Sequence, residues 1–173
     1  MASFSKWFAS VLGQSQIEVE RLLRHPSATH FLVAWSLYES KCFGGYVKPS
    51  KFDDYVVRCI SEGFNIGQLN AHTEHFHTRY QNADRFKSLM HKQSSSRLNQ
   101  ILIQPASTLS SEDRLFLLVF VAYRFRNNIF HGNKGVDSWL RFSEQIDLCT
   151  EALQAFVSHA ELKRCSLRSE NAA

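Results

Sequence analysis

Apolar residues recur every three or four positions along most of the chain, which is the spacing of one face of an α-helix. No series of alternating strands flanked by glycine is present. Residues 101–105 (ILIQP) are predicted as a short extended piece, and the tail from Ser166 is predicted to fray. The predicted helices cover 27–43, 50–62, 66–82, 84–92, 111–131 and 138–165. The pattern therefore favours an all-α fold.

The segment that follows Ser110 is the most apolar of the predicted helices. Ser110 is a good N-cap, because its hydroxyl can accept a hydrogen bond from the Asp113 N–H. Gly132 is placed to end the helix. The expected buried stripe and the aromatic residues that broaden it are Leu115, Leu118, Val119, Ala122 and Ile129, with Phe116, Phe120 and Tyr123. We expect this helix to be enclosed on most sides and to lie at the centre of the fold.

The composition fits one helical domain. The chain has 173 residues, of which 44% are hydrophobic and 14 are Phe, but only 7 are Gly and 3 are Pro. A chain of this length can bury a core without disulfides or metal. The scarcity of Gly and Pro argues against an all-β sandwich and against disorder. Because neither an internal repeat nor a long linker divides the chain, residues 1–173 are predicted to form a single domain.

Cysteine and histidine spacing gives little sign of a metal or redox site. The four cysteines stand far apart, at Cys42, Cys59, Cys149 and Cys165, so no CxxC pair can build a zinc ribbon or a thioredoxin-like motif. His72, His75 and His77 follow the pattern H-x2-H-x-H, which is a weak signature by itself. We therefore predict no metal and no cofactor.

No segment predicts a membrane span. The longest apolar run, residues 115–122, is much shorter than the roughly 20 apolar residues that a membrane helix needs. The first residues do not have the pattern of a signal peptide. We expect a cytoplasmic protein with reduced thiols and no membrane partner.

The positive charge is concentrated in one segment. The formal net charge is +4, and residues 79–97 hold Arg79, Arg85, Lys87, Lys92 and Arg97 against the single carboxylate of Asp84. Aromatic and histidine residues are interleaved with these cations, a mixture that suits single-stranded nucleic acid. The alternative is a solvated helix face that is followed by a polar loop through residues 94–96.

The apolar helix after Ser110 ends in a polar run, RFRNNIFHGNK. Arg126 carries a permanent charge on a planar fork that suits phosphate oxygens, and His131 can take or give a proton near neutral pH. At about 100° per residue, Asn127 and His131 share a face, whereas Arg126 and His131 lie about 140° apart. Arg126 and His131 therefore converge on one ligand only if the last turn unwinds or a second copy of the helix supplies the partner residue. Together they could cleave a phosphodiester without metal.

A structural interpretation of the same run is also open. In it, His131 and Asn128 satisfy carbonyl groups at the helix end, and Arg124 and Arg126 are solvated.

The run RNNIFHG resembles the R-x4-H signature of the HEPN superfamily, the higher eukaryote and prokaryote nucleotide-binding domains. The resemblance includes the polar residue directly after the arginine, here Asn127. In that family the motif lies toward the end of a long helix in an all-α bundle, with another helix after it. In detail the chain is similar to the prokaryotic ApeA-like HEPN domains of abortive-infection and toxin systems. The resemblance covers most of the chain as an architecture and a short stretch as a motif.

The resemblance implies a metal-independent endoribonuclease that acts as a toxin or phage-defence effector. In such enzymes the ribose 2′-OH attacks the adjacent phosphorus and leaves a 2′,3′-cyclic phosphate. His131 would be the general acid/base and Arg126 would stabilise the developing charge. Asn127 and Asn128 would be positioning residues. The active site would be composite, in a homodimer that joins two copies of the motif.

Other residues receive further roles in this hypothesis. Glu39 resembles an acidic residue that many HEPN domains place on an early helix facing the motif, and an exposed surface glutamate is the alternative. Phe125 and Phe130 are candidates to fill the dimer interface. RNA contacts are assigned to Arg124 and Lys134 beside the motif and, from the placement of charge rather than from the resemblance, to Arg85, Lys87 and Lys92. An antitoxin or another defence-system protein is a candidate partner.

Two other functions stay open. One is a non-catalytic HEPN-fold module that binds RNA or a protein, and the other is a regulatory subunit that binds nucleotide. The intact Arg126 and His131 favour the enzyme. Asn133 stands where some family members carry tyrosine, which argues against the subclass that pairs with a nucleotidyltransferase antitoxin.

Overall fold

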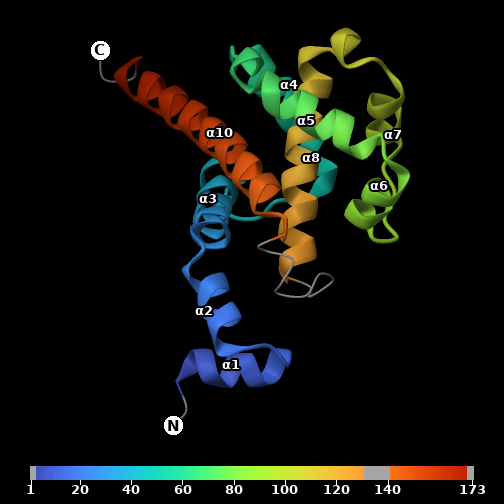
Figure 1. Ribbon diagram of the computed structural model, residues 1–173. Helices are drawn as coiled ribbons and strands as arrows, with labels where there is room; N and C mark the ends of the chain where they lie inside the picture. The colour runs from blue at the N-terminus through green and yellow to red at the C-terminus, as the bar shows by residue number, and fades with distance from the viewer. Residues whose placement is uncertain (1–2, 131–140, 171–173) are drawn as a thin grey trace.

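The computed structural model describes residues 3–130 and 141–170, and within these ranges the chain is all-α, as the apolar pattern predicts (Figure 1). The helices are α1 (Phe4–Leu12), α2 (Gln16–Arg24), α3 (Pro26–Phe43), α4 (Phe52–Ser61), α5 (Asn70–Tyr80), α6 (Ala83–Met90), α7 (Ser96–Ile103), α8 (Ser111–Phe130) and α10 (Ser143–Glu170). Short 3-10 turns lie at Pro49–Lys51, Ile66–Leu69 and Ala106–Thr108. None of the described helices has the length and apolar character needed to cross a membrane.

Helix α8 lies at the centre of the fold. It packs against α4, α5, α6, α7 and α10, and Figure 1 shows it between α10 on one side and α6 and α7 on the other. All eight residues from 115 to 122 are buried, so the helix is enclosed all round and the prediction of a central helix is confirmed. The predicted N-cap is also confirmed, because the Asp113 N–H donates to the Ser110 hydroxyl at 3.1 Å.

The second layer of the core forms where α3 packs along α10. The predicted stripe of α3 is buried and ends at Gly44, whose φ of 70° is the left-handed conformation that glycine adopts without strain. Tyr38 of this stripe contacts Phe156 of α10 and Tyr55 of α4, with ring centroids 5.8 and 5.7 Å apart. Aromatic packing therefore joins α10 to α3 and α4, which lie far from it in the sequence.

One prediction about local structure is wrong. Residues 101–103 are helical rather than extended, because Leu98 and Ile101 are buried one helical turn apart and the Ser95 hydroxyl caps α7 by accepting from the Leu98 N–H. Helix α7 begins at Ser96, so the polar loop of the alternative interpretation ends at Ser95. At the other end of the chain, α10 extends to Glu170, and fraying of the tail from Ser166 stays a prediction.

Helices α1 and α2 form a hairpin at one end of the molecule, which the sequence analysis left without assigned elements (Figure 1). Its buried apolar residues, Ala9, Val19 and Leu22, lie outside the continuous core that runs from Phe31 to Phe156. Ser15 and Glu18 form a capping box at the start of α2. The hairpin is thus a small local unit that is joined to α3 through His25.

Candidate functional site

The polar residues at the carboxyl end of α8 point toward two different neighbours. Arg124 and Asn128 are one turn apart on the same face and meet the end of α6. Arg126 lies on another face and meets α3. The polar run is therefore divided between a buried side and a half-buried side.

The buried side joins α8 to α6. Arg124 is only 7% exposed, and its guanidinium donates to the carbonyl oxygens of Leu89 and Met90 at 3.2 and 2.8 Å. The Asn128 amide donates to the same Leu89 oxygen at 3.1 Å. These bonds add donors to carbonyls at the end of a helix, where a cation is favoured by the helix dipole; the Met90 oxygen also accepts from the Gln93 N–H at 2.9 Å. Burial lowers the pKa of the Arg124 guanidinium below its ordinary value.

These contacts bear on the roles assigned to Arg124 and Asn128. The described bonds of both side chains hold two helices together, in keeping with the structural interpretation for Asn128. The structural interpretation also expected a solvated Arg124, and this is wrong. Arg124 lies in the interior, where two carbonyl oxygens take the place of water as acceptors for its guanidinium. RNA contact by Arg124 and positioning by Asn128 stay predictions.

The half-buried side carries Arg126 and Asn127. Arg126 Nη1 donates to Asn127 Oδ1 at 3.1 Å, and the guanidinium carbon lies 6.0 Å from the centre of the Trp35 ring. The contact with the aromatic ring and the hydrogen bond both restrict the arginine side chain. Arg126 is thus a partly exposed, oriented cation at the end of the central helix.

Glu39 lies one turn beyond Trp35 on α3 and is half-buried. Its carboxylate accepts a hydrogen bond of 3.5 Å from the Val47 backbone N–H. This bond fastens the segment after Gly44 to the helix. A positioning role for Glu39 toward Arg126 stays a prediction.

His131 and Lys134 fall outside the described residues, as does the side chain of Phe130. Phe125 is described, and its assignment to a dimer interface is wrong. It is buried in the chain's own core, where its ring lies 6.5 Å from the rings of both Phe76 and Phe142.

Part of the predicted basic segment lies beside the motif. The charged and amide side chains that line a recess of about 180 Å³ are Arg79 of α5, Asp84 and Arg85 of α6, and Asn128 of α8. The Arg79 guanidinium carbon is 5.8 Å from the centre of the Phe142 ring, at the base of α10. Lys87 and Lys92 are exposed farther along the segment. The structure therefore brings one predicted RNA-contacting residue, Arg85, and one predicted positioning residue, Asn128, to the same recess.

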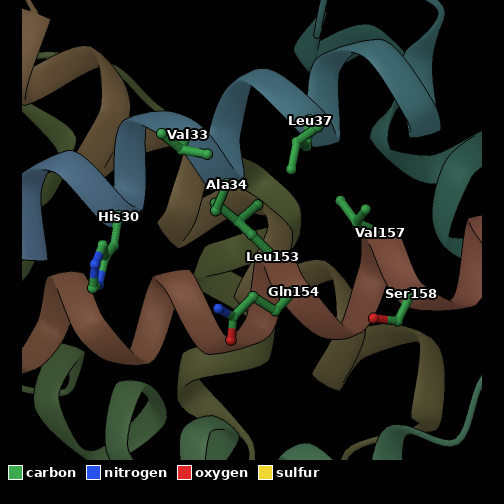
Figure 2. Close-up of a pocket in the computed structure, with 8 residues that line it drawn as sticks. All are labelled: His30, Val33, Ala34, Leu37, Leu153, Gln154, Val157 and Ser158. Atoms are coloured by element: carbon green, nitrogen blue, oxygen red, sulfur yellow. The ribbon is translucent and has the colours of Figure 1, made fainter.

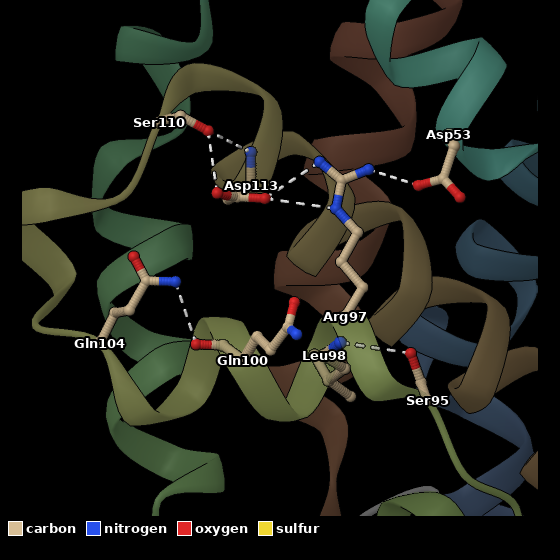
Figure 3. A network of polar contacts seen from close by, with 8 residues as sticks. All are labelled: Asp53, Ser95, Arg97, Leu98, Gln100, Gln104, Ser110 and Asp113. Carbon is tan, nitrogen blue, oxygen red and sulfur yellow. Dashed lines mark hydrogen bonds and ion pairs between the residues drawn. The ribbon is translucent and has the colours of Figure 1, made fainter.

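Arg97 belongs to a different environment (Figure 3). It forms ion pairs with Asp113 of α8, at 3.0 Å, and with Asp53 of α4. Its guanidinium carbon also lies 4.5 Å from the centre of the Phe116 ring. Burial opposes its charge, but the bonds to both carboxylates outweigh burial and raise the pKa of Arg97. Arg97 therefore holds α7 against α4 and α8.

The three closely spaced histidines point to different partners. His72 Nε2 lies 2.7 Å from Glu151, and His75 Nε2 lies 3.4 Å from the Gln145 amide. The buried His77 reaches the carbonyl oxygens of residues 101 and 104, at 3.2 and 3.0 Å. Within residues 3–130 and 141–165, no group of histidine, cysteine and carboxylate side chains is placed to hold a metal ion.

The buried thiols are poor nucleophiles. Burial raises the pKa of Cys42 to about 12 and raises those of Cys59 and Cys149 as well. A thiolate, which is the reactive form, is therefore scarce at all three positions near neutral pH. Cys165 is exposed.

An apolar recess that was not predicted from the sequence lies between α3 and α10 (Figure 2). It has a volume of about 350 Å³ and is lined on α3 by His30, Val33, Ala34 and Leu37. These positions form a second stripe of the predicted helix 27–43, at spacings of three, one and three. The signal was present in the sequence, but the more aromatic stripe through Trp35 obscured it.

A scan of protein-family models, a search of curated proteins and a search of solved structures each find no match to this chain.

Proposed function

We propose that this chain is a metal-independent endoribonuclease of the HEPN type, which acts as a homodimer and serves as a toxin or defence effector. The observation that carries the proposal is an oriented, partly exposed Arg126 at the end of an enclosed helix, five positions before His131. The recess formed with Arg79 and Arg85 supports a polyanionic substrate at the same end of α8.

The chemistry follows from the two side chains. His131 takes the proton of the ribose 2′-OH as the 2′ oxygen forms a bond to phosphorus. The bond from phosphorus to the 5′ oxygen breaks, and a protonated imidazole gives the leaving oxygen its proton. Arg126 stabilises the extra negative charge on the phosphorane through its fork of N–H donors. The products are a 2′,3′-cyclic phosphate and a 5′-OH.

The homodimer accounts for the geometry of the motif. On one regular helix, side chains five positions apart diverge by about 140°. Two copies of the helix end, related by a two-fold axis, let the arginine of one copy face the histidine of the other. Each composite site then contains one acid/base group and one cation.

The experiment incubates purified protein with RNA in the presence of EDTA and reads the chemistry of the new ends. We expect cleavage to survive the chelator, to leave 2′,3′-cyclic phosphates and to fail on a substrate with a 2′-deoxy sugar at the scissile position. Arg126→Ala and His131→Ala should each lower the cleavage rate by about 100-fold or more. Arg21→Ala, which removes an exposed arginine from α2, is the matched control and should cleave normally.

Cleavage that needs a divalent metal, or an active His131→Ala protein, would contradict the proposal. Protein that binds RNA tightly and leaves it intact would indicate the non-catalytic binding module instead.

A further inference from the structure

One face of α1 is apolar and exposed to solvent. Phe4, Trp7 and Val11 are 61%, 54% and 63% exposed, and their spacing of three and four places them on one stripe. Ala9, on another face of the helix, is buried. Large aromatic side chains that gather in this way on a surface indicate a binding partner.

The recess between α3 and α10 is the second exposed apolar feature. Val33 and Leu37 form one wall and are 56% and 44% exposed, and Leu153 and Val157 form the opposite wall (Figure 2). Polar side chains lie along the edges of the recess, among them Ser158. An apolar floor with polar edges is the surface that receives the apolar face of an amphipathic helix.

The two features match in length but do not meet within the chain. Helix α1 has 9 residues and is about 13 Å long, and the wall of the recess from His30 to Leu37 is about 11 Å long. Helix α2, another rod of about 13 Å, lies between α1 and the start of α3. Figure 1 shows α1 at the end of the molecule, beyond α2 and away from α10.

We infer that α1 of one copy of this chain occupies the α3–α10 recess of a second copy, in a reciprocal exchange. A two-fold axis lets each copy give one helix and receive one, so both apolar features are covered in both copies. The exposed parts of Phe4, Trp7, Val11, Val33 and Leu37 amount to roughly 500 Å² per copy. A standard stable interface buries roughly 800 Å² per partner, so these side chains would supply more than half of the area that a dimer needs.

The charge of α1 favours a second copy over a lipid surface. Helices that lie on membranes carry several basic residues on their polar face. Helix α1 has one cation, Lys6, and serines occupy its other polar positions. Its apolar face therefore fits a protein recess better than an anionic bilayer.

The exchange requires only that the chain dimerises, and it stands whether or not the chain cleaves RNA. Light scattering over a range of concentrations measures the dimer. We expect Trp7→Asp and Val33→Asp each to weaken dimerisation by about 30-fold or more, since both side chains would be central to the interface. Ile103→Asp is the matched control, because Ile103 is 83% exposed on α7 and lies outside both features. Both tested side chains are exposed, so helical content by circular dichroism should match the parent.

A cross-linking experiment tests which copy fills the recess. Two variants are made in a Cys165→Ser background. One carries Ser10→Cys on α1, and the other carries Ser158→Cys at the edge of the recess and a tag that gives it a different size. A short bis-maleimide should join the two proteins when they are mixed.

Three results would overturn the inference. The first is a parent protein that stays monomeric, and the second is a dimer that Trp7→Asp and Val33→Asp leave intact. The third is a cross-link that forms only within one chain when both cysteines are placed together, which would show that α1 folds onto its own recess. A monomer that binds anionic vesicles through Trp7 would identify a lipid surface as the partner.

Discussion

The Arg124 guanidinium on α8 donates a hydrogen bond of 2.8 Å to the carbonyl of Met90, the last residue of α6. Because Arg124 also donates to Leu89, one buried cation fixes the end of α6 against the end of the central helix. This contact places the basic segment beside the polar run of α8. The position of the candidate RNA-binding surface therefore depends on a residue that lies in the interior.

Removing this cation should destabilise the fold. Arg124→Met keeps much of the apolar volume but removes the charged donor that joins α8 to the Leu89 and Met90 carbonyls. The Asn128 amide and the Gln93 N–H still donate to these oxygens, so we expect the free energy of unfolding to fall by about 1.5–3 kcal/mol. Urea denaturation followed by circular dichroism measures the change. Arg21→Met, at an exposed position of α2, should change the free energy by less than about 0.5 kcal/mol. Equal stability of the Arg124→Met and parent proteins would show that these bonds contribute little.

The exposed cations of the basic segment should determine how RNA binding depends on salt. Replacing Arg85, Lys87 and Lys92 by Gln should lower the slope of log affinity against log salt by about 2, since each lost contact removes about 0.7 on a single strand. The cleavage rate at saturating RNA should stay near that of the parent, because these residues take no part in proton transfer.

The matched control for this triple variant replaces Lys6, Arg21 and Arg24 by Gln. All three are exposed on α1 and α2, away from the recess that contains Arg85. The control should keep the parent's salt slope in filter-binding assays. An equal loss of slope in both variants would indicate a general effect of net charge.

His159 should make the fold less stable in acid. Burial lowers its pKa and outweighs the nearby carboxylate of Glu62, which lies 3.7 Å away, while Lys163 adds to the lowering. A histidine with a lowered pKa favours folding while it is neutral. Its contribution is therefore present above the ordinary pKa of about 6.5 and is lost as the pH falls below that value.

Denaturation curves between about pH 7 and pH 5 test this dependence. His159→Gln should lose less stability over this range than the parent does. His91→Asn is the control, because His91 is exposed and asparagine tolerates its left-handed backbone. A parent whose stability is flat over the range would contradict the prediction. His75, whose pKa burial also lowers, should contribute in the same direction.

The four cysteines should differ sharply in reactivity. Three are buried with raised pKa values, and Cys165 is exposed. Titration with Ellman's reagent at about pH 8 should modify one thiol per folded chain and four after unfolding. Cys165→Ser should abolish the fast reaction. Rapid modification of a second thiol in the folded protein would mean that α3, α4 or α10 opens readily.

The sequence by itself determined most of the helices after residue 26 and the identity of the central one. An apolar period of three to four fixes which residues share a face, and local signals such as Ser110 and Gly44 fix where helices begin and end. Both kinds of signal act over a few residues. The prediction for residues 101–103 was wrong. Their short apolar run is typical of an extended piece, but the burial of Leu98 and Ile101 against the rest of the core stabilises a helix.

Only the tertiary structure decided which faces meet. Periodicity gives Arg124 and Asn128 a common face, but the carbonyls they bind belong to residues 34 to 39 positions away. The same holds for Arg97. It lies in the basic segment of the sequence, but the structure pairs its guanidinium with Asp53 and Asp113. It also holds for Phe125, which looked surplus to the core and lies within it. Each of these contacts forms because helices that are remote in sequence pack together. The pattern of residues along one helix does not determine which other helix packs against it.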